Sequence, residues 1–122
     1  MRTLPLGKTD IEITEFIFGA GSIGGVGGAA ATRGLGISAE QGLDRLSEAR
    51  ALGIRVIDTA DTYGGGESER TVGRWLAEQR PGDVLVQTKV GGIARAGQAR
   101  ADLSGPHIER QPLLGRCTRR RG

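Results

Sequence analysis

Three side chains suited to acid–base chemistry lie in the middle of the chain: Asp58, Tyr63 and Lys89. Tyr63 is the chain's single tyrosine, and it follows Asp58 by five residues in the stretch D-T-A-D-T-Y-G. A phenol with a reference pKa of about 10 transfers protons poorly at neutral pH, but a neighbouring ammonium lowers the pKa of a phenol, and a carboxylate fixes that ammonium. Lowering the pKa of the phenol by two or three units corresponds to roughly 3–4 kcal/mol. The trio predicts a general acid for carbonyl reduction; an ordinary ion pair beside a surface tyrosine is the alternative.

Two predicted strands must bring these side chains together. The β-branched run at residues 54–58 predicts a buried strand that ends at Asp58, and residues 84–90 predict another that carries Lys89 near its end. A helix is expected between them over Glu67–Arg80, with its apolar face formed by Val72, Trp75 and Leu76. Parallel pairing of the strands, about 4.8 Å apart, would place both side chains at the same rim.

The preceding segments predict the same kind of repeating unit. Residues 3–18 alternate around a turn at residues 6–10, which predicts a hairpin leading into a first buried strand that contains Phe16, Ile17 and Phe18. Residues 19–36 hold eight glycines and are expected to form a loop. A helix then begins at Ser38 with Gln41 in capping-box spacing, and Gly53 ends it. Its apolar stripe is Leu43, Leu46, Ala49 and Leu52.

The order of strand, helix, strand, helix, strand predicts an α/β protein with three parallel strands and its chemistry at their carboxyl ends. The stretch G-A-G-S-I-G at residues 19–24 also matches the G-x-G-x-x-G fingerprint of dinucleotide-binding folds. That fingerprint requires a helix to open at once, whereas more glycine follows here. We therefore favour a loop, with dinucleotide binding at this motif as the alternative.

Length, cysteine content and charge argue against a multidomain, disulfide-rich, membrane or nucleic-acid-binding protein. A chain of 122 residues has room for one domain, and a single cysteine, Cys117, excludes an internal disulfide. We see neither a signal peptide nor a run apolar enough to cross a membrane, so we expect a soluble, cytoplasmic protein without a membrane partner. The net charge is +3, but residues 110–122 hold five arginines, and the remainder carries a net charge of −2. The basicity is thus confined to the tail, and we expect no specific nucleic-acid partner.

The hairpin start, residues 58–69, Trp75-Leu76 and Thr88-Lys89-Val90 resemble the N-terminal portion of the aldo-keto reductase family, over about residues 2–109. The resemblance implies part of a (β/α)₈ TIM barrel, with two to three βα units after the hairpin. It also implies NADPH, or NADH, as cofactor, and a small carbonyl compound or sugar as substrate. Asp58, Tyr63 and Lys89 match three of the family's four catalytic residues. The long glycine-rich loop is similar to that of family members that act on sugars.

The C-terminal part departs from that family pattern. The fourth catalytic residue is a histidine after a fourth strand, whereas His107 falls where relatives open their third helix. The residues that bind the phosphates of the cofactor in the family come later in the barrel. A complete barrel needs about 250 residues. We therefore expect residues 1–110 to be the N-terminal part of a reductase barrel and residues 111–122 a basic tail, disordered or translated from a shifted frame. Such a fragment would be weakly active or inactive by itself; a non-catalytic fragment or small interaction protein is the alternative.

Overall fold

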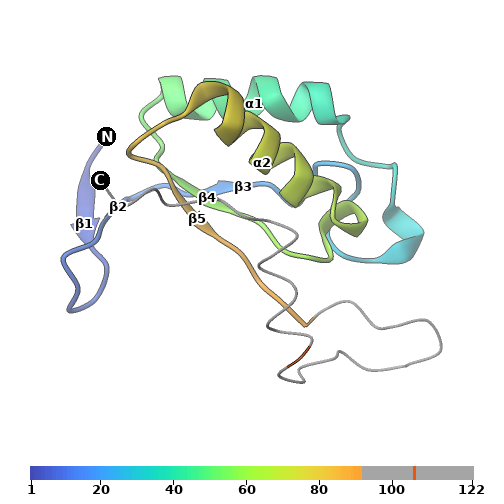
Figure 1. Ribbon diagram of the computed structural model, residues 1–122, viewed down its shortest axis with the longest axis horizontal. Coiled ribbons are helices and arrows are strands. Elements are labelled where there is room, and N and C mark those ends of the chain that lie inside the picture. The colour runs from blue at the N-terminus through green and yellow to red at the C-terminus, as the bar shows by residue number, and fades with distance from the viewer. Residues whose placement is uncertain (92–105, 107–122) are drawn as a thin grey trace.

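The computed structural model describes residues 1–91 and Pro106. Its central element is a parallel sheet of three short strands in the order β3 (Phe18–Gly19), β4 (Val56–Asp58) and β5 (Leu85–Gln87). Helices α1 (Ala39–Ala51) and α2 (Glu67–Gln79) connect these strands and cover one face of the sheet (Figure 1). The predicted order of elements and the parallel pairing are therefore confirmed.

An antiparallel hairpin precedes the sheet. Strand β1 (Thr3–Pro5) pairs with β2 (Glu12–Thr14), as the alternation and the turn predicted. The first buried strand, in contrast, is smaller than predicted: β3 has two residues, and Phe16 and Ile17 are exposed. Apolar residue type alone did not decide burial here, because Phe16 and Ile17 precede the pairing with β4, which begins at Phe18 opposite Ile57.

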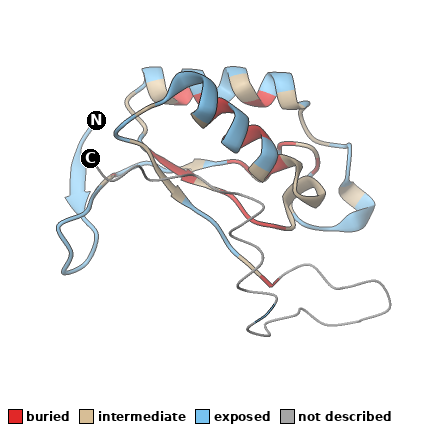
Figure 2. Cartoon of the chain, viewed as in Figure 1, coloured by how far each residue is buried: buried red, intermediate tan, exposed pale blue. Residues whose placement is uncertain are grey.

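The hydrophobic core lies between the helices and the sheet (Figure 2). Trp75 of α2 is almost fully buried, and its indole Nε1–H donates a hydrogen bond to Ser47 Oγ of α1 at 2.9 Å. This bond satisfies the polar end of an otherwise apolar side chain, as buried tryptophans usually require. The other buried members of the core come from both helices, from β4 and from the glycine-rich loop: Ala20, Ile23, Leu46, Ile57 and Val72.

Both helices keep to their predicted bounds within a residue or two. At the start of α1 the Gln41 N–H donates to Ser38 Oγ at 3.2 Å, and the Ser38 N–H donates to Gln41 Oε1 at 3.0 Å, which confirms the capping box. The predicted apolar stripe is wrong at Leu52, which is 72% exposed because it lies beyond the last helical residue as the C-cap. Helix α2 ends at Gln79, with Arg80 in a left-handed conformation.

Strands β4 and β5 are shorter than the apolar runs that predicted them. The hydrogen-bond ladder nevertheless continues past both strands, since the Thr59 N–H donates to the Gln87 carbonyl oxygen at 2.9 Å and the Asp61 N–H donates to the Lys89 carbonyl oxygen at 3.0 Å. These bonds keep the segments after the two strands side by side. Lys89 therefore stays beside the segment that follows Asp58, beyond the regular sheet.

The glycine-rich segment forms a loop with one short 3-10 helix, η1 (Ala30–Thr32), and the first α-helix, α1, begins only at Ala39. At Gly24 the backbone φ is +76°, and a Cβ would lie 2.4 Å from the Cβ of Glu67. Gly24 is therefore needed for close packing against the start of α2. The G-x-G-x-x-G motif lies in a loop, as we favoured, and does not lead into a helix N-terminus of the kind that binds a dinucleotide.

Several predictions fall outside the described residues: the placement of His107 at a helix start, the free Cys117 and the tail at residues 111–122. Within residues 1–91, no helix combines the length and the apolar character that a membrane span requires.

Candidate active site

The candidate site lies on the sheet face that points away from the helices. Ile57 and its register partners Phe18 and Val86 pack against the helices. Successive strand residues point to opposite faces, so Asp58 and its partner Gln87 face the other side. Lys89, two residues beyond Gln87, lies on the same face as Asp58, to which it hydrogen-bonds.

The Lys89 ammonium is held by three oxygen atoms. Its Nζ donates to Asp58 Oδ1 at 2.9 Å, to Asp58 Oδ2 at 2.8 Å and to the Thr59 carbonyl oxygen at 2.8 Å. Three acceptors match the three N–H donors of an ammonium. The side chain of Lys89 is 47% exposed and that of Asp58 24% exposed, so the pair lies at an accessible rim. The predicted convergence of the carboxylate and the ammonium is present in the structure.

Tyr63 completes the predicted group. It opens a short 3-10 turn, η2 (Tyr63–Gly65), between β4 and α2. The Lys89 Nζ lies 4.8 Å from the centroid of the Tyr63 ring, which is within the range of a cation–π contact. On another side of the ring, a Cβ on Gly21 would lie 3.5 Å from Tyr63 Cε2, so the glycine-rich loop passes close beside it. The structure thus brings all three predicted residues together from two separate segments.

The surroundings keep Lys89 charged. Burial lowers the pKa of Lys89, but its hydrogen bonding with Asp58 and its interaction with Tyr63 outweigh burial, and the net result is a raised pKa. The ammonium is therefore the state present at neutral pH.

Two residues at the site were not predicted from the sequence. Gln87 donates from Nε2 to Asp58 Oδ1 at 2.9 Å, and the buried Asp61 accepts from the Gly91 N–H at Oδ2 at 2.9 Å. Gln87 lies two residues before Lys89, and Asp61 lies two residues before Tyr63. The sequence could have indicated their contacts only if the strand register had been known. Gln87 binds Asp58, and Asp61 binds Gly91, so both contacts lie next to Lys89.

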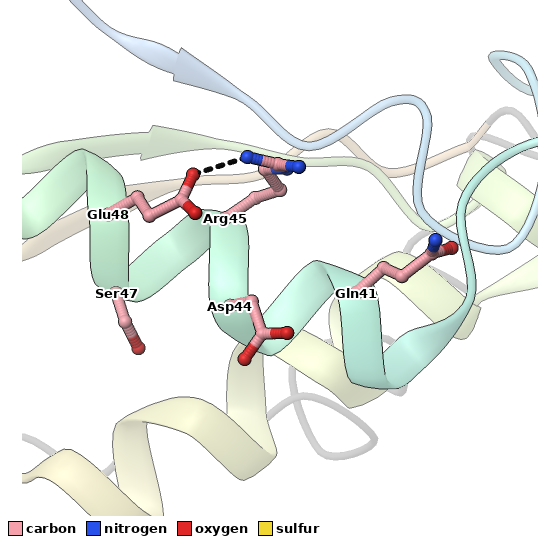
Figure 3. Close-up of a pocket in the computed structure, with 5 residues that line it drawn as sticks. All are labelled: Gln41, Asp44, Arg45, Ser47 and Glu48. Atoms are coloured by element: carbon pink, nitrogen blue, oxygen red, sulfur yellow. Dashed lines mark hydrogen bonds and ion pairs between the residues drawn. The ribbon is translucent and has the colours of Figure 1, made fainter.

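A separate hollow lies along α1, away from these residues (Figure 3). Its lining is polar and comes from one helix: Gln41, Asp44, Arg45, Ser47 and Glu48. Arg45 and Glu48 point toward one another and form an ion pair. An exposed ion pair of this kind contributes little to stability, and the hollow lies apart from the Asp58, Tyr63 and Lys89 group.

Comparison with known proteins decides the family. The model of the Aldo/keto reductase family matches residues 16–111, which include Asp58, Tyr63 and Lys89. The chain belongs to the aldo/keto reductase family. Members of this oxidoreductase family use nicotinamide cofactors and act on small carbonyl compounds.

Curated relatives agree with that assignment. The NADH-specific methylglyoxal reductase of Escherichia coli (strain K12) is 37% identical over 91 residues, which cover 75% of this chain and 27% of the relative. The L-galactose dehydrogenase of Arabidopsis thaliana is 36% identical over 88 residues, 70% of this chain and 25% of the relative. The chain therefore spans about a quarter of the length of these two enzymes.

Solved structures show the fold of which this aldo-keto reductase chain is a part. An aldo-keto reductase from Bacillus halodurans superposes with a TM-score of 0.69 at 31% identity, covering 89% of this chain and 33% of that structure. The glycerol dehydrogenase from Gluconobacter oxydans gives a TM-score of 0.65 at 29% identity, covering 89% and 33%. These neighbours are (β/α)₈ barrels, so the predicted partial TIM barrel is confirmed.

Proposed function

We propose that residues 1–110 form the N-terminal part of an aldo-keto reductase that reduces aldehydes or ketones, or oxidises sugars, with a nicotinamide cofactor, and that Asp58, Tyr63 and Lys89 are its catalytic residues. The observation that carries the proposal is the contact of Lys89 Nζ with both Asp58 oxygens and its 4.8 Å distance from the Tyr63 ring. An ammonium so placed has a carboxylate on one side and a phenol on the other.

The three residues divide the proton transfer between them. The Tyr63 hydroxyl donates its proton to the carbonyl oxygen of the substrate and takes it back in the oxidative direction. The Lys89 ammonium stabilises the phenolate left on Tyr63, because opposite charges attract strongly at a partly dehydrated rim. Asp58 holds the ammonium toward the phenol through two hydrogen bonds. Positioned acid–base groups of this kind contribute about 10²–10⁴-fold to rate.

The donor set fits the reacting end of a nicotinamide cofactor, which supplies the hydride when bound and accepts it in the oxidative direction. Tyr63 and Lys89 provide the proton and the charge that hydride transfer to a carbonyl carbon requires at the oxygen. We place no phosphate cradle at the G-x-G-x-x-G motif, because Gly24 packs tightly against Glu67 there. NADPH is the proposed cofactor, with NADH as the other candidate, since the Escherichia coli relative is named NADH-specific.

The substrate class is a small aldehyde, ketone or sugar. The names of relatives include a methylglyoxal reductase, an aryl-alcohol dehydrogenase and an L-galactose dehydrogenase. These names describe one reductase and two dehydrogenases. We propose that this protein likewise reduces aldehydes or ketones, or oxidises sugars, in the cytoplasm.

The alternative to an enzyme is a non-catalytic fragment or small interaction protein, and the arginine-rich tail at residues 111–122 is the feature that favours it. Cofactor binding separates the two. We expect the enhanced fluorescence of NADPH or NADH on titration with the purified chain, and no binding at millimolar cofactor would favour the fragment.

Catalysis by the proposed residues is tested with the purified chain and methylglyoxal, L-galactose and an aromatic aldehyde as substrates, by following nicotinamide absorbance. Tyr63→Phe keeps the ring but removes the hydroxyl, and we expect turnover to fall by about 10²–10⁴-fold. Lys89→Met should lower turnover as well, whereas Lys8→Met, at the other lysine of the chain, should not. Where the unaltered chain turns a substrate over, equal turnover in Tyr63→Phe would disprove the role of Tyr63.

A further inference from the structure

Asp61 is a buried carboxylate that the proposed proton transfer does not use. It is 3% exposed and lies in the stretch between Asp58 and Tyr63. A buried carboxylate is costly unless hydrogen bonds satisfy it. Its Oδ2 accepts the Gly91 N–H at 2.9 Å, in a bond that is itself buried. The residue therefore joins the loop after β4 to the segment after β5.

The main chain of Asp61 makes the same connection. Its N–H donates to the Lys89 carbonyl oxygen at 3.0 Å, so Asp61 binds the Lys89–Gly91 segment through both its backbone and its side chain. The Asp61 carbonyl oxygen is turned toward the loop, where it lies 3.8 Å from the position of a Cβ on Gly66. The side-chain carboxylate thus accepts the Gly91 N–H in place of the carbonyl that would continue a parallel ladder.

Gly91, the donor of this bond, has a left-handed backbone. Its φ is +96°, a conformation that residues with a side chain rarely adopt, and it is buried. The turn at Gly91 presents its N–H to Asp61 Oδ2 directly after Lys89 and Val90. The bond between Asp61 and Gly91 therefore joins the two segments close to the proposed catalytic residues: Tyr63 lies two positions beyond Asp61, and Lys89 two positions before Gly91.

We propose that Asp61 is a positioning residue, whose buried carboxylate clamps the Lys89–Gly91 segment to the loop of Tyr63 and so sets the separation between the Lys89 ammonium and the Tyr63 ring. The role rests on the proposed function, because the separation matters only if the two groups share a proton-transfer step. Small displacements of such groups are costly to catalysis: a shift of about 1 Å can lower a rate by about 10²-fold.

The test uses the full chain with its two lysines, Lys8 and Lys89, labelled with ¹³C. The Lys89 side chain lies over an aromatic ring, so its ε-methylene protons should be shifted upfield by the ring current relative to those of Lys8. Tyr63→Leu should abolish this shift and gives the signal expected for full separation. Lys8→Arg assigns the two resonances.

Two matched substitutions at Asp61 isolate the hydrogen bond from the charge. Asp61→Ala and Asp61→Asn both remove the negative charge, but only asparagine keeps an oxygen that can accept the Gly91 N–H. We expect the upfield shift of Lys89 to be lost in Asp61→Ala and retained in Asp61→Asn. An unchanged shift in Asp61→Ala would overturn the proposal, and so would its loss in a folded Asp61→Asn.

A measurement on the unaltered chain covers the case in which Asp61→Ala does not fold. The scalar coupling across the hydrogen bond, from the Gly91 nitrogen to the Asp61 carboxyl carbon, should be detectable, and its absence would overturn the proposal. These readouts report geometry and need no cofactor. A clamp that is present in a chain that binds no nicotinamide would refute the proposed function alone, whereas an active chain with an unchanged shift in Asp61→Ala would refute the clamp alone.

Discussion

The two faces of strands β4 and β5 differ sharply in composition, although they are made by neighbouring residues. Ile57 and Val86 face α1 and α2 and belong to the apolar core. Asp58 and Gln87, the next residues along each strand, face away and hydrogen-bond to each other. One face holds the structure together, and the other carries the proposed catalytic residues Asp58 and Lys89. Period-two alternation lets short strands do both, so substitutions on the two faces should have separable effects.

The largest expected effect is on the helix-facing side. Trp75→Ala should lower the free energy of unfolding by about 3–5 kcal/mol, because it removes a large buried side chain and leaves a cavity. Urea denaturation followed by circular dichroism measures this, since Trp75 is the chain's one tryptophan and its fluorescence is lost. Arg74→Ala, at the half-exposed neighbouring residue, is the control and should lower the stability far less, because exposed ion pairs contribute little. Equal losses in the two variants would contradict a core centred on Trp75.

A smaller effect on stability is expected at the start of α1, one of the two helices that cover the sheet. Ser38→Ala should lower the free energy of unfolding by about 1 kcal/mol, because the Gln41 N–H loses its capping acceptor. The measurement is again urea denaturation. Glu48→Ala, on the exposed surface of the same helix, should change stability less. A Ser38→Ala variant as stable as the unaltered chain would show that the cap adds nothing to the packing of α1.

On the opposite face, substitution should change titration more than stability. Asp58→Asn removes the partner that raises the pKa of Lys89 and leaves the burial that lowers it, so we expect the pKa of Lys89 to fall. Stability should change by less than about 1 kcal/mol, since the pair is partly exposed. The ¹³Cε resonance of Lys89 reports its titration, with Lys8 as internal reference. Asp83→Asn, which breaks the ion pair with Arg50, is the control and should leave the pKa of Lys89 unchanged. An unchanged pKa of Lys89 in Asp58→Asn would contradict the expected difference between the two faces of the sheet.

The smallest effect is the pH dependence of stability from Lys89. Its pKa is raised in the folded chain, so its contribution is fully present below the ordinary lysine pKa of about 10.4 and is lost as pH rises through the folded value. Because the side chain is 47% exposed, this contribution should stay below about 1 kcal/mol. Unfolding free energies of the unaltered chain and Lys89→Met should therefore converge at high pH. A difference that grows with pH would have the wrong sign.

Local features of the fold were predictable because short-range rules govern them. The capping box at Ser38, the hairpin and the two helices depend on residues a few positions apart, and they lie where the sequence placed them. The predicted burial of Phe16 and Ile17 failed because it depends on where strand pairing begins. The choice between a loop and a nucleotide-binding turn at Gly24 depended likewise on contact with a distant residue, Glu67.

The sequence by itself determined the order of strands and helices, and it supplied an acid, a phenol and an amine in a pattern typical of aldo-keto reductases. Only the tertiary structure decided that Gln87 lies beside Asp58, and that Asp61 ties the Lys89–Gly91 segment to the Tyr63 loop. The reason is the range of the interactions: these bonds join residues 29 and 30 positions apart, and a register shift of one residue would turn each side chain to the other face.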